Sequence, residues 1–266
     1  MGRARKVQDE EIVTTKRVRG SSRRAVKEEL SVVKPPTKEK FSADVAKKLG
    51  DFKLTPKQQE MRDVISSNTL SFVEAPAGTG KTSAILYDFC KEYLVDPTKK
   101  IVVVRTPVEA ASLDKIGFLP DDLNAKIEPH FESTKKILVD FLGAGRVECD
   151  LGHRIFFKIP NYMVGCTIDN ALMLVDEGQL LQPMIMKLIL ERIGQGSRVV
   201  VAGDVSQIYA NEKEANLRNG LGDALSRFFT PDMEAKYDSV GYFSFDVDDV
   251  QRSDIVKSVI KAYRNG

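Results

Sequence analysis

The segment 75–82 has the residue types and spacing of a loop that binds phosphate. It reads Ala-Pro-Ala-Gly-Thr-Gly-Lys-Thr and follows a short apolar run at 70–74. Glycines let the backbone turn several N–H groups toward an anion, and the N-terminus of a following helix adds a positive dipole. Lys81 can reach the β- and γ-phosphates of a nucleoside triphosphate, and the Thr82 hydroxyl can bind Mg²⁺. The segment predicts a nucleotide site made by Ala75, Pro76, Ala77, Gly78, Thr79, Gly80, Lys81 and Thr82.

Ala75 stands where the strict pattern has glycine, so a glycine-rich turn with an incidental Lys-Thr pair is the competing interpretation. A second segment favours the phosphate loop, because the apolar run 172–175 leads directly into Asp176 and Glu177. Ligands bind at the carboxyl ends of strands in open α/β sheets. We expect Asp176 to hold Mg²⁺ and Glu177 to deprotonate an attacking water. Alone, two such acids could equally begin a helix, but the phosphate loop upstream favours catalysis.

A third segment, 199–207, again ends an apolar run with polar residues and reads Val-Val-Val-Ala-Gly-Asp-Val-Ser-Gln. The side-chain amide of Gln207 can donate to a γ-phosphate and accept from the attacking water. It could therefore sense whether the third phosphate is present. The pattern Gly-Asp-x-x-Gln is weak evidence alone, and gains weight from its place after the paired acids.

A segment before the first strand predicts which nucleobase the site recognises. It reads Leu-Thr-Pro-Lys-Gln-Gln and covers 54–59. A glutamine amide can pair with both N6 and N7 of adenine, which suits ATP. Gln58 is the expected reader, and its neighbour Gln59 is the alternative. A solvated glutamine on a helix is the competing interpretation.

The basic charge of the chain is concentrated at its N-terminus. The 266 residues carry a net charge of +2, but residues 1–50 hold 14 Lys or Arg against 7 Asp or Glu. Residues 1–40 show no hydrophobic period, so we expect 1–50 to be a flexible basic tail before a single folded domain at 51–266. Such a tail either solubilises the protein or gives salt-sensitive affinity for nucleic acid.

The cysteines, histidines and apolar segments of the chain argue against a zinc site, a membrane span and secretion. Zinc is not expected, because the cysteines are far apart and accompany only two histidines. No apolar stretch approaches the roughly 20 residues that span a bilayer, and the N-terminus lacks a secretory pattern. We expect reduced thiols in a cytoplasmic protein with no membrane partner. The residues concerned are Cys90, Cys149, Cys166, His130 and His153.

The apolar runs predict an α/β fold with a mainly parallel sheet, because they alternate with helical segments. Strands are expected at 70–74, 101–104, 172–175, 198–202 and 243–245, and a hairpin strand at 154–159. Helices are expected at 56–67, 81–95, 182–193 and 253–263, with a mixed, mainly helical region at 107–150 and a short helix at 41–50.

The order of these segments resembles that of superfamily 1 helicases and RecA-like ATPases, and in finer detail the PhoH family. The resemblance covers about 50–264 and rests on 75–82, 104–110, 116–120, 167–171, 176–179, 203–207 and 245–259. It implies a RecA-like P-loop NTPase fold and Mg²⁺-dependent ATP hydrolysis coupled to RNA or single-stranded DNA, with helicase activity compatible. Two departures are that 162–167 lacks two arginines usual in the family, and that Gly178 replaces a more usual alanine.

Phosphoryl transfer usually needs a cation near the γ-phosphate, worth about 10³–10⁵ in rate. In the helicases of this resemblance, that arginine comes from a second RecA-like domain, and 51–266 has room for only one. We therefore expect a neighbouring subunit to supply it, in a ring or a filament with ATP at the interfaces, and a hexameric ring is the expected assembly. Arg252 is the first candidate by match to the family's C-terminal segment, with Arg218 and Arg105 as alternatives. A surface residue at a helix start is the competing interpretation of Arg252.

Two other functions stay open. A protein whose ATP state switches its grip on a partner would need no strand separation. A small-molecule kinase fits poorly, because Asp176, Glu177 and Gln207 suit water as the nucleophile. After the strand 101–104, Arg105 or Thr106 could contact a nucleic-acid phosphate, or Arg105 could pair with Glu109.

Overall fold

A computed structural model describes residues 49–106, 123–160, 163, 165, 167–207 and 219–264, without the side chains of 123–128, 263 and 264. All of them belong to Pro36–Gly266, one of the two units into which the chain divides. The expected tail up to residue 48, the region 107–122, Cys166 and Arg218 lie outside the described residues. Among the helices that are described, none combines the length and apolarity needed to cross a bilayer.

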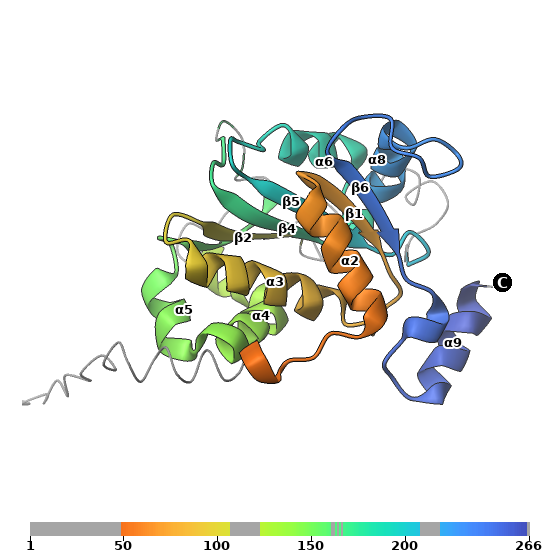
Figure 1. Ribbon diagram of the computed structural model, residues 1–266, viewed down its shortest axis with the longest axis horizontal. Coiled ribbons are helices and arrows are strands. Elements are labelled where there is room, and N and C mark those ends of the chain that lie inside the picture. Colours follow the sequence, from red (N-terminus) through yellow and green to blue (C-terminus); the bar gives the residue numbers. More distant parts are fainter. Residues whose placement is uncertain are drawn as a thin grey trace, which may run out of the picture. The chain divides into compact units, whose positions relative to one another are not determined.

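The described part is built on a six-stranded sheet in the order β3-β2-β4-β5-β1-β6, and its ladders are all parallel (Figure 1). Parallel strands are buried on both faces, which explains why the apolar runs are continuous. The arrangement confirms the α/β, RecA-like P-loop NTPase fold. The strands are β1 Leu70–Glu74, β2 Lys100–Arg105, β3 Ile155–Lys158, β4 Ala171–Asp176, β5 Arg198–Gly203 and β6 Val240–Ser244.

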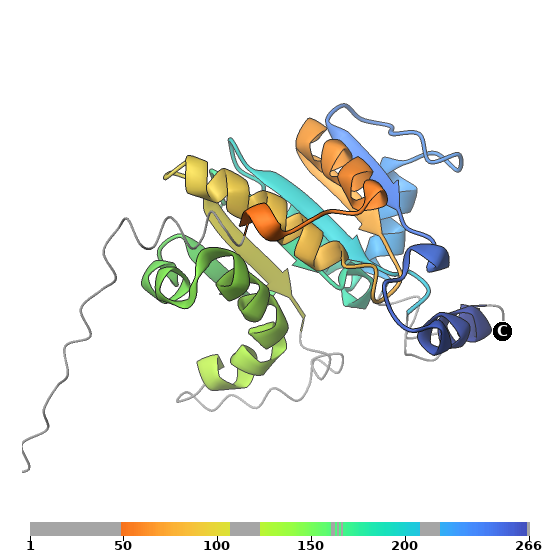
Figure 2. The same cartoon turned by 60° about the horizontal axis from the view of Figure 1, so that its bottom comes forward.

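Helices cover both faces of the sheet (Figures 1 and 2). One core cluster joins the sheet to α2, α3, α4 and α5, and a second joins it to α6 and α8. Because side chains alternate along a strand, β4 sends Leu172 and Leu174 into the first cluster and Met173 and Val175 into the second. The helices are α2 Pro56–Ser67, α3 Lys81–Val95, α4 Leu123–Leu142, α5 Ala144–Asp150, α6 Pro183–Leu190, α8 Gly220–Phe228 and α9 Asp254–Arg264.

The last strand begins three residues earlier than expected and ends one residue earlier, at 240–244 instead of 243–245. Two other elements differ in kind from the sequence-based expectation. The run at 154–159 does not form a hairpin, because β3 pairs in parallel with β2, Ile155 lying opposite Ile101. The helix α8 was not expected, since it contains two glycines. Its N-cap residue Asn219 accepts a hydrogen bond from Gly222 N, and the chain approaches so closely that a Cβ on Gly220 would lie 2.8 Å from the carbonyl oxygen of Leu181.

Candidate active site

The three polar segments singled out in the sequence follow three adjacent strands, β4, β5 and β1. Carboxyl ends of parallel strands lie at one edge of a sheet, so the segments come together there. The phosphate loop is tied to this edge directly, because Ala75 N donates to the carbonyl oxygen of Gly203 at 2.8 Å. In the sheet, β5 lies between β4, which leads into the paired acids, and β1, which leads into the phosphate loop. Gln207 follows the end of β5.

The loop after β1 has the backbone geometry that an anion site requires. Gly78 and Gly80 have φ angles of 90° and 74°, in the region where glycine is favoured. Gly80 is the N-cap of α3 and provides no side-chain cap, so the first N–H groups of the helix are left for an anion. The buried Lys81 Nζ donates to the carbonyl oxygen of Ala75 at 3.3 Å and keeps further donor hydrogens. These residues fit a nucleotide's phosphates.

Thr82 and Asp176 provide a pair of oxygen atoms suited to Mg²⁺. The Thr82 hydroxyl lies 3.5 Å from Asp176 Oδ1, although the two residues belong to different strand–loop units. The Asp176 side chain is buried, with 4% of the residue exposed. Burial and the neighbouring charge of Glu177 raise the pKa of the Asp176 carboxyl, against the opposing effect of Arg105 and Lys81. A buried carboxylate charge costs free energy unless a cation lies next to it. The oxygen atoms of Thr82 and Asp176 therefore fit a divalent ion.

Because the pKa of Asp176 is raised on folding, its ionisation opposes folding at neutral pH. Without metal, Asp176→Asn is therefore expected to raise the free energy of unfolding. The gain should be absent below the ordinary carboxyl pKa of about 3.9, grow as pH rises from there to the raised value, and stay constant above it. Urea unfolding at several pH values in a chelator measures it, with the exposed Asp232→Asn as control. A gain of equal size at every pH would contradict the assignment.

Glu177 follows Asp176 in a backbone conformation that non-glycine residues rarely adopt. Its φ and ψ are 56° and 45°, and such strain is typical of functional sites. One carboxylate oxygen, Oε2, accepts from Gln179 Nε2 at 2.7 Å. The other, Oε1, lies 4.0 Å from a guanidinium nitrogen of Arg105. The side chain keeps 26% of its surface exposed, so it can meet a water as well as these partners.

Two buried residues without an assigned role in the sequence join the paired acids to Gln207. Gln179 binds Glu177 and also accepts from Asp204 N at 3.1 Å. Asp204 in turn accepts from Gln207 Nε2 at 2.9 Å. A Cβ on Gly203 would lie 2.3 Å from Gln179 Oε1, so glycine is required for this approach. The sequence signals for these two residues are that both closely follow strand ends and that both lie in segments on which the family resemblance rests.

Gln58 lies against the phosphate loop, where its amide positions the chain. It is buried, and its Nε2 donates to the carbonyl oxygen of Thr79 at 3.0 Å. Its Oε1 accepts from Thr55 N at 3.1 Å, and Thr55 Oγ1 accepts from Gln58 N, which forms a capping box at the start of α2. The structure thus links α2 to the loop through Gln58, and adenine reading stays a prediction.

Arg252 lies beside the phosphate loop of its own chain. Gln251 N donates to the carbonyl oxygen of Gly78 at 2.9 Å. A Cβ on Gly78 would lie 2.9 Å from both Cδ and Nε of Arg252. The sequence led us to expect this arginine at a neighbour's site, whereas the fold places it against its own loop, far away in the sequence.

Arg105 also reaches the site, from the end of β2. Its register partner in β4 is Asp176, and its guanidinium faces Glu177. Glu109, the partner considered from the sequence, lies outside the described residues.

Most of the chain is similar to proteins of one family. The model of the family described as PhoH-like protein matches residues 52–264. A PhoH-like protein of Bacillus subtilis (strain 168) is 34% identical over 207 residues, which are 77% of this chain and 61% of the relative. Protein PhoH of Escherichia coli (strain K12) is 33% identical over 203 residues, 75% of this chain and 54% of the relative. The chain thus spans little more than half the length of these curated relatives.

Among solved structures, the large terminase ATPase domain of Thermus phage P74-26 aligns with 81% of this chain and 88% of its own, at 12% identity and a TM-score of 0.43. The SWI2/SNF2 ATPase core of Sulfolobus solfataricus aligns with 75% of this chain and 47% of its own, at 12% identity and a TM-score of 0.42. The family model covers most of the chain and includes the phosphate loop, the paired acids and the segment of Arg252. The chain belongs to the PhoH-like protein family.

Proposed function

We propose that this protein hydrolyses ATP with Mg²⁺ and couples hydrolysis to binding or remodelling of RNA or single-stranded DNA. The observation that carries the ATPase is the meeting of three strand ends, with Thr82 Oγ1 3.5 Å from Asp176 Oδ1 and Glu177 next to it. A phosphate cradle, a metal pair and a neighbouring base are the parts that nucleotide hydrolysis requires.

In this mechanism the loop N–H groups and Lys81 bind the phosphates of ATP, and Thr82 and Asp176 would hold Mg²⁺. The bound ion would neutralise charge on the phosphate oxygens. Glu177 takes a proton from water as the water oxygen attacks the γ-phosphorus, and the bond from that phosphorus to the leaving ADP oxygen breaks. Gln207, whose side chain donates to Asp204, would orient the water. Gln58 supports the loop through Thr79.

Nucleic acid is the proposed partner because the N-terminal segment 1–50 is strongly basic. Helicase activity and translocation without unwinding are both compatible with this site. The rival from another class is a protein that uses ATP only as a switch for nucleic-acid binding. It differs in that nucleic acid would not accelerate its hydrolysis, while ATP would change its affinity for nucleic acid.

Self-association into a ring, with a hexamer as the expected size and ATP between subunits, is a further part of the proposal. Its support is the face of α9 that carries Ile255 and Val259, which are 69% and 48% exposed and lie one turn apart. Exposed apolar groups of this kind mark contact surfaces when they gather. The position of Arg252 beside its own loop does not require such a contact. Light scattering with and without ATP tests the assembly.

The proposed function is tested by phosphate release from ATP, without and with single-stranded RNA and DNA, for wild type and Lys81→Ala. We expect wild-type hydrolysis that requires Mg²⁺ and rises with nucleic acid, and background rates for the variant. The exposed Lys187→Ala is the matched control. If no phosphate is released from ATP under any condition, the proposed ATPase activity is refuted. If nucleic acid does not change the rate of hydrolysis, the result favours a protein that uses ATP only as a switch. Strand separation of a labelled duplex then distinguishes a helicase from a translocase.

A further inference from the structure

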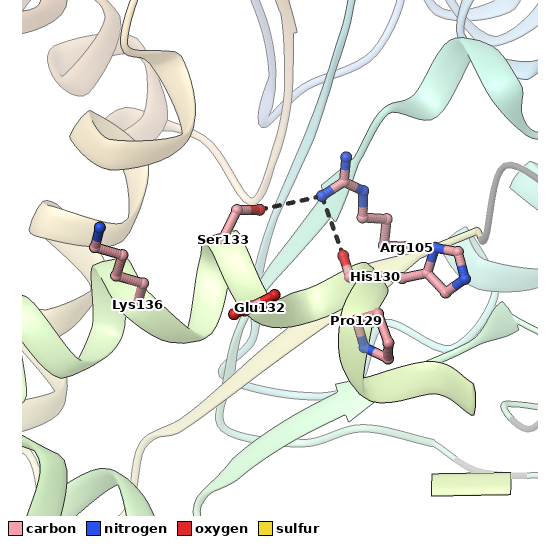
Figure 3. Close-up of a pocket in the computed structure, with 6 residues that line it drawn as sticks. All are labelled: Arg105, Pro129, His130, Glu132, Ser133 and Lys136. Carbon is pink, nitrogen blue, oxygen red and sulfur yellow. Dashed lines mark hydrogen bonds between the residues drawn. The ribbon is translucent and has the colours of Figure 1, made fainter. Parts of the chain in front are cut away.

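Arg105 bridges Glu177, the proposed catalytic base, and helix α4. One guanidinium nitrogen, NH2, lies 4.0 Å from Glu177 Oε1. The other, NH1, donates to the carbonyl oxygen of His130 at 3.2 Å and to Ser133 Oγ at 3.4 Å, both on α4 (Figure 3). A single side chain therefore connects the base of the proposed hydrolysis to α4, and the mechanism above does not use this connection.

A pocket of about 450 Å³ opens between this arginine and α4 (Figure 3). Its lining carries two permanent cations, Arg105 and Lys136, against one acid, Glu132, and is completed by Pro129, His130 and Ser133. Pro129, Ser133 and Lys136 recur at helical spacing, so they share one face of α4. Within the described part of the chain, the side chain of Lys136 has no hydrogen bond or ion pair. The pocket is thus suited to an anion that lies along the helix.

The contacts of Arg105 leave it able to exchange partners. At 4.0 Å its contact with Glu177 is an ion pair too long for a hydrogen bond, and its contacts on α4 are to neutral oxygens. A phosphodiester offers two charged oxygens that match the guanidinium fork, which makes a stronger pairing than either. Meanwhile Gln179 holds the second oxygen of Glu177. Movement of the guanidinium would open to water the side of the other oxygen that now faces Arg105.

We propose that Arg105 is a positioning residue that couples a nucleic-acid site to hydrolysis. A backbone phosphate of a single-stranded nucleic acid binds the pocket along α4, draws the guanidinium from Glu177 and frees the carboxylate to accept a proton. This inference rests on the proposed ATPase and specifies how nucleic acid would regulate it. Arg105 restrains the base in the absence of nucleic acid and joins the binding site in its presence.

The test measures ATP hydrolysis by the full chain alone, with an oligo-U RNA and with an oligo-dT DNA, for wild type, Arg105→Gln and Arg105→Met. For both variants we expect a basal rate several-fold above wild type and no further rise with either oligonucleotide. Arg105→Met keeps the apolar stem, so a folding defect in one variant does not decide the result. If only one of the two oligonucleotides stimulates wild type, the result shows whether RNA or DNA binds the pocket, and it supports the proposal.

A second variant probes the pocket away from Glu177. Lys136→Ala is expected to need several-fold more oligonucleotide for half-maximal stimulation. The slope of its log affinity against log salt should fall by about one. The exposed Lys187→Ala on α6 should match wild type in both measurements.

The outcomes separate this inference from the function on which it rests. A guanidinium that only bound nucleic acid would lose stimulation without a raised basal rate, and a purely structural one would lower both. Basal rates at or below wild type in both folded Arg105 variants therefore overturn the coupling. Wild type that hydrolyses ATP but responds to neither oligonucleotide overturns it too, with the ATPase intact. Failure of wild type to hydrolyse ATP refutes the proposed function itself.

Discussion

Replacement of Glu177 by glutamine is expected to slow ATP hydrolysis by about 10²–10⁴-fold, the usual contribution of a general base. Glutamine has the same size and keeps an oxygen that can accept from Gln179 Nε2, but it cannot take a proton from water. The metal pair of Thr82 and Asp176 stays intact. Binding of ATP should therefore be unchanged, and the variant should hold ATP without turnover. Phosphate release and the affinity for a fluorescent ATP analogue measure the two effects.

The exposed Glu234→Gln is the control for a charge change of the same kind. Glu177 is held in a strained conformation, so a variant that relaxes it could gain stability. The thermal midpoint of both variants shows whether such a change accompanies the loss of rate. A Glu177→Gln protein that hydrolyses ATP as fast as wild type would remove Glu177 from the role of base.

The sheet was largely predictable because its strands are buried on both faces. Continuous apolar runs such as Val102–Val104 and Leu172–Val175 are typical of such strands, and the structure has β2 and β4 there. The helix α2 was equally clear, since Thr55 and Pro56 give a cap and a first-turn proline. In each case a local pattern contains all the information that the element needs.

Where the prediction was incomplete, distant contacts decide the structure. A hairpin strand and a parallel edge strand have the same local pattern, and what distinguishes them at Ile155 is the helical crossover that precedes it. The helix α8 forms although Gly220 and Gly222 weaken it, because close packing against Leu181 needs a residue without a side chain. Packing overrides propensity in both elements.

The residues of the candidate site also fall into two groups, those that a local sequence pattern predicts and those that only the fold reveals. Residues at strand ends or in the loops that follow them, such as Lys81, Asp176 and Glu177, were predictable as a group, because parallel topology alone brings strand ends together. Side chains that reach the site from elsewhere were not. Arg105 extends from β2 to Glu177, and Arg252 returns to Gly78 from the end of the chain, and only the folded arrangement shows these contacts.

Replacement of Arg252 by alanine is expected to reduce turnover by about 10³–10⁵-fold, the usual effect of losing an arginine near the transferred phosphate. Affinity for ATP should stay near wild type, because Lys81 and the loop N–H groups still bind the phosphates. Loss of nucleotide binding together with turnover would instead assign Arg252 to holding the loop. Arg227→Ala, which removes an exposed arginine on α8, is the matched control.

Mixing two inactive proteins decides whose site Arg252 serves. Lys81→Ala keeps the arginine and lacks the loop lysine, and Arg252→Ala has the reverse. If the arginine acted on a neighbour in an oligomer, some interfaces of a mixed assembly would combine an intact Lys81 with an intact Arg252, and hydrolysis would recover. Because Arg252 lies 2.9 Å from a Cβ position on Gly78 of its own chain, we expect no recovery. Recovery on mixing would show that Arg252 leaves its own loop when subunits assemble and acts at the site of a neighbouring subunit.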